Sequence, residues 1–425
     1  MFENVIAQPA IQLLIDDISS SRMPAAVLFS GPQAAGKLTS ALETARILSC
    51  TQGSAGWTCS CGSCLRHREL THPDLLIIGT RDCLPEIKAA AKTFLGTNTQ
   101  STRYLFIRSV RKLLVRFSPV LFNTEESRFS KAASIISDME ELLEELRPSR
   151  QIPDAAGLPE KTIDSLVNLS EKLETDCLYD SIPVTQVRNA SSWAHLTPFG
   201  RKKILIVENA DRMQESSRNA FLKLLEEPPK ATVFILTSSR RSAIMPTILS
   251  RVRTYAFVDR DQNSVNEVIS RVFHDGIAEN ISLSEYFNRF LPVSQEIISS
   301  AAFLVLNEMQ SYSEKHNRTP LPALRNELNA VRTKMQSDSQ TAVSGQTLSL
   351  MLHKCNPKII WNLFLMKIMD MLHNALHSEL SGAAETAVFN LWTSRIREAY
   401  DLVGIFNISS ASVMDQLIQD MKDDL

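Results

Sequence analysis

The glycine-rich stretch after residue 30 constrains the fold of this chain more than any other part of its sequence. Gly31 to Lys37 read GPQAAGK and fit G-x-x-x-x-G-K, between an apolar segment at 25–30 and an amphipathic segment at 38–49. This order predicts a strand, a loop that wraps a phosphate group, and a helix whose first amide groups point at that phosphate. Lys37 would add a positive charge. The predicted fold class is therefore α/β, with a parallel sheet that carries a phosphate-binding loop.

Two positions depart from the pattern of proteins that cleave nucleoside triphosphates. Leu38 stands where the full motif has Ser or Thr to hold Mg²⁺, and Thr39 lies about 100° further around the helix. The predicted strand at 202–211 carries Glu208, which could contact a metal, followed by Asn209, whose amide is a poor general base. The residues expected to form the site are Gly31, Gly36, Lys37, Leu38, Thr39 and Glu208.

We expect this site to keep a capacity for ATP and Mg²⁺ while lacking two parts that hydrolysis needs. The alternative is a glycine turn without a ligand. In that case Glu208 and Asn209 are polar residues that end a strand and cap the next helix.

The remaining sequence changes character twice. Apolar segments at 74–79 and 232–239 predict further strands of the sheet. Residues 82–181 instead show helical periodicity, with a proline-containing linker at 146–161, and we interpret them as a helical insertion in the α/β domain. From residue 259 onward only amphipathic helical patterns occur.

Four cysteines that fall within fifteen residues indicate a metal site rather than disulfides. Four thiolates suit a tetrahedral Zn²⁺, and without an open position the zinc would be structural. His67 could replace Cys59 or Cys61 as a ligand, and reduced cysteines without a metal are the alternative. The expected ligands, in a module at 50–67, are Cys50, Cys59, Cys61 and Cys64. Cys83, Cys177 and Cys355 stand alone in the sequence and are expected to be buried or incidental.

Charge and hydropathy exclude some classes of protein. The formal net charge of the 425 residues is −2, so any contact with nucleic acid has to come from a local patch. The N-terminus lacks the pattern of a signal peptide, and no apolar run reaches the ~20 residues that cross a bilayer. We expect a cytoplasmic protein without a membrane partner.

Several blocks, in this order, resemble the small subunits of the bacterial DNA polymerase III clamp loader, within the AAA+ family. The most specific are NAFLKLLEEPP at 219–229 and PTILSRV at 246–252. The other matching blocks are 31–37, the cysteine cluster, His72-Pro73-Asp74, 207–213 and 232–239. The resemblance covers about residues 1–81 and 182–258.

The resemblance implies an AAA+ domain at 1–258, a small helical lid at 259–305 and an all-helical collar for oligomerisation at 306–425. Leu38 and Asn209 point to the δ′ subunit, which often has a decayed phosphate loop and does not hydrolyse ATP. Arg251 would then reach across a subunit boundary to the ATP of a neighbouring motor subunit. The implied partners are γ/τ and δ subunits in a hetero-oligomer, a sliding clamp, and primed DNA as part of the assembly.

Two other functions stay open at this point. One is an active ATPase motor of the γ/τ type, with Glu208 organising Mg²⁺ and a base from elsewhere. The other is an AAA+-derived scaffold that binds partners through its insertion, a segment that clamp-loader subunits do not ordinarily carry.

The insertion also contains a basic stripe on one predicted helix face. Its members, spaced i, i+3, i+4 and i+8, are Arg108, Arg111, Lys112 and Arg116. This stripe could bind DNA phosphates or an acidic partner. It could equally pair with the acidic sequence DMEELLEEL of the same insertion.

Overall fold

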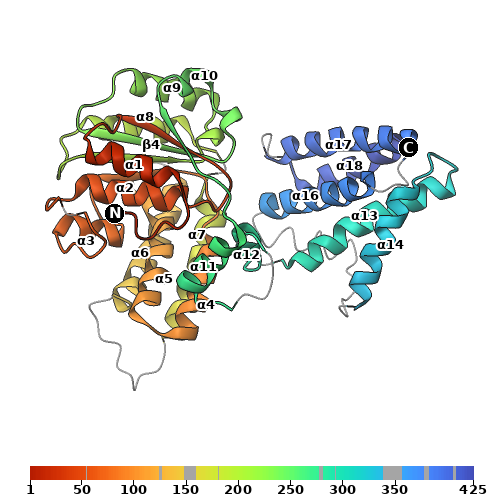
Figure 1. Cartoon of the computed structure of the whole chain (residues 1–425), viewed down its shortest axis with the longest axis horizontal. Helices are drawn as coiled ribbons and strands as arrows, with labels where there is room; N and C mark the ends of the chain where they lie inside the picture. The colour runs from red at the N-terminus through yellow and green to blue at the C-terminus, as the bar shows by residue number, and fades with distance from the viewer. Residues whose placement is uncertain are drawn as a thin grey trace. The chain divides into compact units, whose positions relative to one another are not determined.

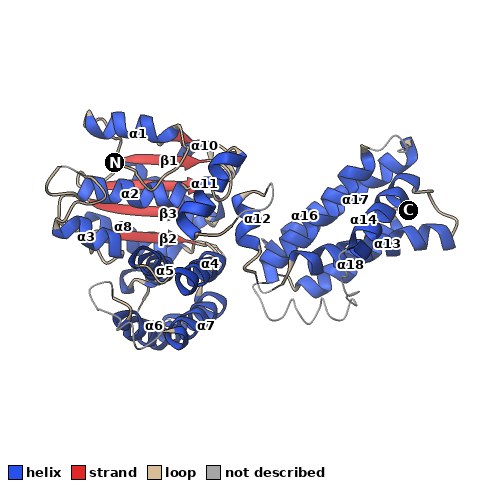
Figure 2. Ribbon diagram, turned by 60° about the horizontal axis from the view of Figure 1, so that its bottom comes forward, coloured by secondary structure: helices blue, strands red, loops and turns tan. Residues whose placement is uncertain are grey.

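Five parallel strands form a single sheet in the N-terminal part of the chain, as drawn in red in Figure 2. The order across the sheet is β2-β3-β4-β1-β5. Their bounds are Ala26–Ser30 for β1, Leu75–Gly79 for β2, Lys203–Glu208 for β3, Thr232–Ser238 for β4 and Arg253–Ala256 for β5. This confirms the predicted α/β class and parallel sheet.

The structure is a computed structural model. It describes all residues except 54, 124–126, 148–158, 180, 277–280, 292, 338–356, 378–381 and 405–407. Most of the predicted linker at 146–161 and the isolated Cys355 therefore lie outside the described residues.

Strands β1 to β4 are buried along their whole length, which explains their continuous apolar sequences. Alternate residues of β1 serve the two faces of the sheet. Val27 and Phe29 face one apolar cluster, and Ala26 and Leu28 face the other. β5 is half exposed and pairs with β1 at the sheet edge.

Helices cover both faces of the sheet (Figure 1). α1 (Ala10–Ser19), α2 (Lys37–Ser49) and the cysteine segment pack on the face that contains Phe29. The opposite face is covered by α8 (Val184–His195), α9 (Glu215–Glu226) and α10 (Pro246–Leu249). α3 (Gly62–Glu69) follows the cysteine segment and contacts α2.

The predicted insertion is helical and gathers beyond the β2 edge of the sheet (Figure 2). Its buried residues, such as Phe94, Phe106 and Leu173, join the same apolar cluster as Leu76 and Leu205 of the sheet. The insertion therefore shares the core of the α/β domain. Its helices are α4 (Leu84–Thr97), α5 (Gln100–Leu114), η1 (Val115–Phe117), η2 (Pro119–Leu121), α6 (Ser127–Glu145) and α7 (Glu160–Cys177).

The chain divides into two compact units, Met1–Phe290 and Leu291–Leu425. The first unit ends with α11 (Gln262–Phe273) and α12 (Leu283–Asn288), which pack on α4. The division falls inside the segment 259–305 that we expect to form a lid, and the lid and collar remain predictions.

The second unit consists of helices around one apolar cluster that includes Trp361 and Trp392. Both indole groups are fully buried and donate hydrogen bonds, from Trp361 to the carbonyl of Ala399 and from Trp392 to the carbonyl of Met421. Its described helices are α13 (Gln295–Lys315), α14 (Pro322–Ser337), α16 (Pro357–Leu376), α17 (Ala383–Gly404) and α18 (Ser410–Asp423).

Candidate nucleotide site and metal site

The glycine-rich loop joins the carboxyl end of β1 to the first residue of α2, as its sequence predicts. Gly31 cannot be replaced without movement, because a Cβ atom there would lie 2.3 Å from the carbonyl oxygen of Phe257. Gly36 has a φ of 90°, a left-handed value that glycine adopts at little cost, and α2 begins at the next residue. The two glycines thus shape the loop that the motif describes.

The amine of Lys37 is turned onto the loop's own backbone. Its Nζ donates hydrogen bonds to the carbonyl oxygens of Gly31 and Pro32, and the residue is only 9% exposed. Burial lowers the pKa of Lys37 to about 8, although the nearby carboxylates of Glu208 and Asp211 favour its charged form. In this structure the loop carbonyls accept the hydrogen bonds that the Lys37 amine would otherwise donate to a phosphate group.

Arg260 is a loop contact that the sequence reasoning missed. Its guanidinium donates hydrogen bonds to the carbonyl oxygens of Ala34 and Ala35, at 2.9 and 3.1 Å, and to that of Ile6 at 3.0 Å. A Cβ atom at Gly36 would come within 3.0 Å of the same guanidinium. The only sequence signal is a basic residue just after the last strand, which is too common to identify a role.

Leu38 lies in the apolar core beneath the loop and is 5% exposed. A leucine side chain offers no ligand atom to a metal ion. Thr39 is half-buried on α2. Position 38 of α2 therefore contributes to the apolar core beneath the loop.

Glu208 ends β3 at the carboxyl edge of the sheet, where the sequence places it, but it is ion-paired. Arg116 of the insertion contacts one carboxylate oxygen, and Arg81 lies 3.7 Å from the other. The side chains of Arg116 and Glu208 are 1% and 6% exposed. The carboxylate of Glu208, which the sequence suggested as a metal ligand, is thus ion-paired with two arginines.

Asn209 adopts a left-handed backbone conformation with φ of 52°. Its side-chain amide donates to the carbonyl oxygen of Thr80 at 2.6 Å, and its backbone N–H donates to the hydroxyl of Thr237 at 3.2 Å. Asp211 accepts a hydrogen bond from Ser238 at 2.7 Å. Asn209 therefore joins the ends of β2, β3 and β4 as a structural link.

The four predicted cysteine ligands come together and are all buried. Their sulfur atoms lie within 4.8 Å of one another, and those of Cys50 and Cys59 are 3.8 Å apart. Four sulfurs at the Zn–S bond length of ~2.3 Å around a tetrahedral ion would be about 3.8 Å apart. The donor set and its spacing therefore fit Zn²⁺, which would tie the loop at 51–60 to α2 and α3.

Arg46 of α2 supports this cluster from within. Its guanidinium is 1% exposed, pairs with Glu43 at 2.9 Å, and reaches the carbonyl oxygens of Ala55 and Gly56 and the sulfur of Cys64. A cation beside four thiolates offsets their negative charge once a metal is bound.

In the described part of the chain, the group of residues whose ligand atoms lie close enough to share a metal ion consists of the four cysteines and does not include His67. Burial lowers its pKa to about 2, and its ring stacks on that of His72 at 4.1 Å. The open alternative, in which His67 replaces a cysteine, has no support from this geometry.

The contacts of the basic stripe differ from the pairing with 138–146 that the sequence left open as one alternative. Arg108 donates to the carbonyl oxygens of His67 and Arg68, and Arg111 donates to that of Glu69. These carbonyls end α3, so the two arginines cap that helix, where its dipole is negative. The remaining members contact carboxylates elsewhere: Lys112 contacts Glu86, and Arg116 contacts Glu208.

Arg251 follows α10 on the surface of the first unit. It donates to the carbonyl oxygen of Thr247 at 2.9 Å and pairs with Glu226 at 2.8 Å. The side chains of Arg251 and Glu226 are 35% and 51% exposed, so solvent or a partner could replace this contact. Its predicted action on a neighbouring subunit stays a prediction.

Residues 6–261 match the family described as "DNA polymerase III, delta subunit", and the chain belongs to this family of clamp-loader subunits. Among curated relatives, it is 39% identical to "DNA polymerase III subunit delta'" of Pseudomonas aeruginosa over 19% of this chain and 24% of that protein. It is 32% identical to the delta' subunit of Bacillus subtilis over 25% of this chain and 33% of that protein.

Relatives of another type match as well. The chain is 31% identical to "DNA polymerase III subunit gamma/tau" of Mycobacterium tuberculosis over 17% of this chain and 12% of that protein. These matches span a third or less of the relatives' own length. Within the described part of the chain, no helix is both long and apolar enough to span a membrane.

Proposed function

We propose that this chain is a clamp-loader subunit of the δ′ type, which works in a DNA polymerase III assembly without hydrolysing ATP itself. The observation that carries the proposal is the buried ion pair of Glu208 with Arg116. A magnesium ion at Glu208 would have to displace a guanidinium that is held in the interior. Separating a buried pair of this kind costs about 3–5 kcal/mol.

The loop itself supports the same function. The amine of Lys37 is already bound by the carbonyls of Gly31 and Pro32, and Arg260 holds the next part of the loop. Leu38 lies in the core and offers no hydroxyl, and the carboxylate of Glu208 is paired with Arg116, so neither of these two positions offers a free ligand to a metal. ATP can enter this site only if the Lys37 contacts are exchanged for phosphate contacts.

In the assembly, the first unit would act as a comparatively fixed surface against which ATP-driven motor subunits of the γ/τ type rearrange. The collar helices would hold it in a hetero-oligomer with γ/τ and δ subunits, and the assembly would load a sliding clamp on primed DNA. Zinc, bound by the four cysteines, would have a structural role. Arg251 would leave Glu226 and stabilise negative charge on the ATP of a neighbouring motor subunit.

Reconstitution with candidate motor subunits tests this role. We expect Arg251→Ala to lower the ATPase rate of the assembly by about tenfold or more, since an arginine supplied in trans can contribute ~10³-fold to phosphoryl transfer. Arg241→Ala, another exposed arginine near α10, is the matched control and should leave the rate unchanged. Gel filtration of each mixture separates lost catalysis from lost assembly. Equal rates for Arg251→Ala and wild type in intact assemblies would refute the trans role.

The second candidate is an active motor of the γ/τ type. It is favoured by the match to gamma/tau relatives and by the intact Gly36 and Lys37 of the loop. It requires magnesium-dependent ATP turnover by the isolated chain, which the δ′ proposal excludes.

A further inference from the structure

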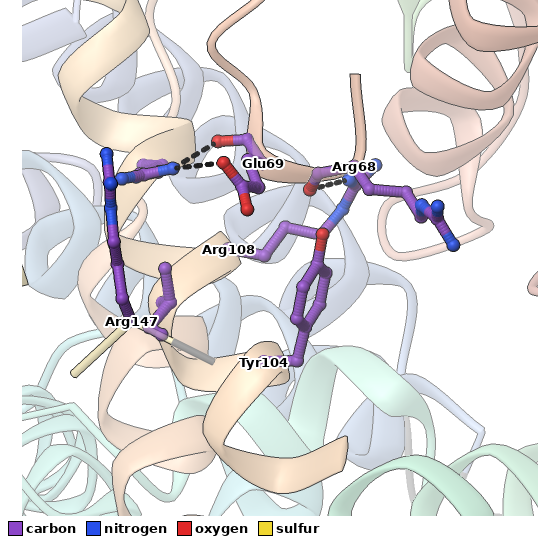
Figure 3. A pocket seen from close by; sticks show the side chains of 7 residues that line it. Arg68, Glu69, Tyr104, Arg108 and Arg147 are labelled. Atoms are coloured by element: carbon purple, nitrogen blue, oxygen red, sulfur yellow. Dashed lines mark hydrogen bonds and ion pairs between the residues drawn. The ribbon is translucent and has the colours of Figure 1, made fainter. Parts of the chain in front are cut away.

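A small hollow, partly open to solvent, lies between α3 and the insertion helix α5. Figure 3 shows Glu69, Tyr104, Arg108 and Arg147 around it, with Arg68 contributed from α3. The polar residues that line it are Arg68, Glu69, Tyr104, Arg108, Arg111 and Arg147. We call this set the arginine pocket.

The arginine pocket carries uncompensated positive charge. Four arginines and one glutamate line it, and the carboxylate of that glutamate, Glu69, lies 3.8 Å from Arg111. Glu144, outside the lining, pairs with Arg147 at 2.8 Å, and two positive charges still remain. The hydrogen bonds of Arg108 and Arg111 to α3 carbonyls do not alter this balance, because carbonyl groups satisfy donors without carrying a formal charge.

Two arginines of the lining also carry a donor without a partner among the described residues. The Nε atoms of Arg68 and Arg111 are buried and have no hydrogen-bond partner among the described residues. Arg111 is only 4% exposed, so water has little access to satisfy it. A buried donor without a partner costs about 1–3 kcal/mol, which a bound anion would recover.

The pocket is held in place before any ligand arrives. Arg108 and Arg111 are fixed by the carbonyls that end α3, and Arg68 is fixed by the carbonyls of Trp57 and Cys59, each at 2.7 Å. Tyr104 adds a phenol whose pKa is raised by burial, so it stays a neutral donor. Rigid donors lose little entropy when they bind a ligand.

We propose that the arginine pocket binds a phosphate group, either free or in the backbone of a nucleic-acid strand. Planar guanidinium groups match the oxygens of phosphate in two-point hydrogen bonds, and a surplus of at least two positive charges suits a dianion or a polyanion better than a single carboxylate. The site belongs to the insertion and α3, and it goes beyond the proposed function, since neither the loader role nor the phosphate loop requires it.

The test uses the chain of residues 1–425, purified in the presence of zinc, with two probes at low salt. Calorimetry measures the binding of inorganic phosphate, and fluorescence anisotropy measures the binding of a labelled single-stranded oligonucleotide. Arg147→Ala is the informative variant because Arg147 is half exposed and its loss leaves the core intact. Arg271→Ala is the matched control, since Arg271 is also exposed and also paired with a glutamate a few residues before it in the chain.

Loss of one charge-assisted contact should weaken binding by about tenfold in Arg147→Ala. It should also lower the salt dependence of oligonucleotide binding by about one unit of slope, with no change in Arg271→Ala. Binding of phosphate alone assigns a free ligand, and binding of both probes assigns a nucleic-acid strand. The proposal is overturned if neither probe binds, if Arg147→Ala binds like wild type, or if poly-glutamate binds these residues more tightly than either probe.

Discussion

Replacing Arg116 by methionine would test the buried contact that joins the insertion to β3. The change would leave Glu208 in the interior with Arg81, at 3.7 Å and 28% exposed, and the nearby Lys37 to balance its charge. Breaking a buried pair costs about 3–5 kcal/mol, and we expect the lower end of this range, about 3 kcal/mol, because Arg81 remains. Amide hydrogen exchange of Lys203–Glu208 measures this loss locally, and the predicted acceleration is about 100-fold.

Two further variants make the measurement specific. Glu208→Gln combined with Arg116→Met removes both charges, so the double variant should be more stable than the sum of the single changes by about 2 kcal/mol. Arg251→Met removes an exposed pair with Glu226 and is the matched control, worth about 1 kcal/mol or less. If Arg116→Met exchanges within a few-fold of wild type, or the double variant shows no coupling, the argument that Glu208 is locked by the insertion fails.

Two other predictions concern the metal and the acid side of the pH range. Elemental analysis of the purified chain should find one zinc ion per chain. Cys64→Ser should lose this ion and unfold at a lower temperature. Cys177→Ala, which changes a buried cysteine outside the cluster, should keep it. Burial opposes the charge of Glu86, but the cations around it, chiefly Lys112 and Arg81, together outweigh burial, and the pKa of Glu86 falls from 4.5 to about 2. Stability from this pair is therefore present above pH 4.5 and lost as the pH falls toward 2, so Glu86→Gln should flatten the acid limb of a pH-dependent unfolding curve. Full zinc content in Cys64→Ser, or an unchanged acid limb in Glu86→Gln, would contradict these two accounts.

The sequence predicts well those features that are encoded locally. β1 and β2 are buried at every position, so their apolar runs are unambiguous. The loop after β1 needs glycine at 31, where a side chain would collide with Phe257, and at 36, where φ is positive. The four clustered cysteines all come from one short segment. Each of these predictions depends on neighbours in the chain, which periodicity and spacing describe directly.

Features that depend on distant contacts could not be predicted in the same way. β5, at Arg253–Ala256, has two exposed residues among four and becomes a strand only by pairing with β1. The partner of Glu208 lies 92 residues away in the insertion, and that of Ala34 is Arg260, 226 residues away. The basic stripe was predicted from helical spacing, but its partners include backbone carbonyls of α3, which have no signature in the sequence.

The measurement that tests the central claim most directly is magnesium-dependent phosphate release from ATP by the isolated, zinc-loaded chain. We predict that the chain releases phosphate no faster than a Lys37→Ala variant, and that both rates equal that of buffer alone. The reason is that the carboxylate of Glu208 is paired with Arg116 and the residue directly after Lys37 is a leucine without a hydroxyl. Sustained turnover by the wild-type chain that disappears in Lys37→Ala would contradict the account and identify the protein as a motor.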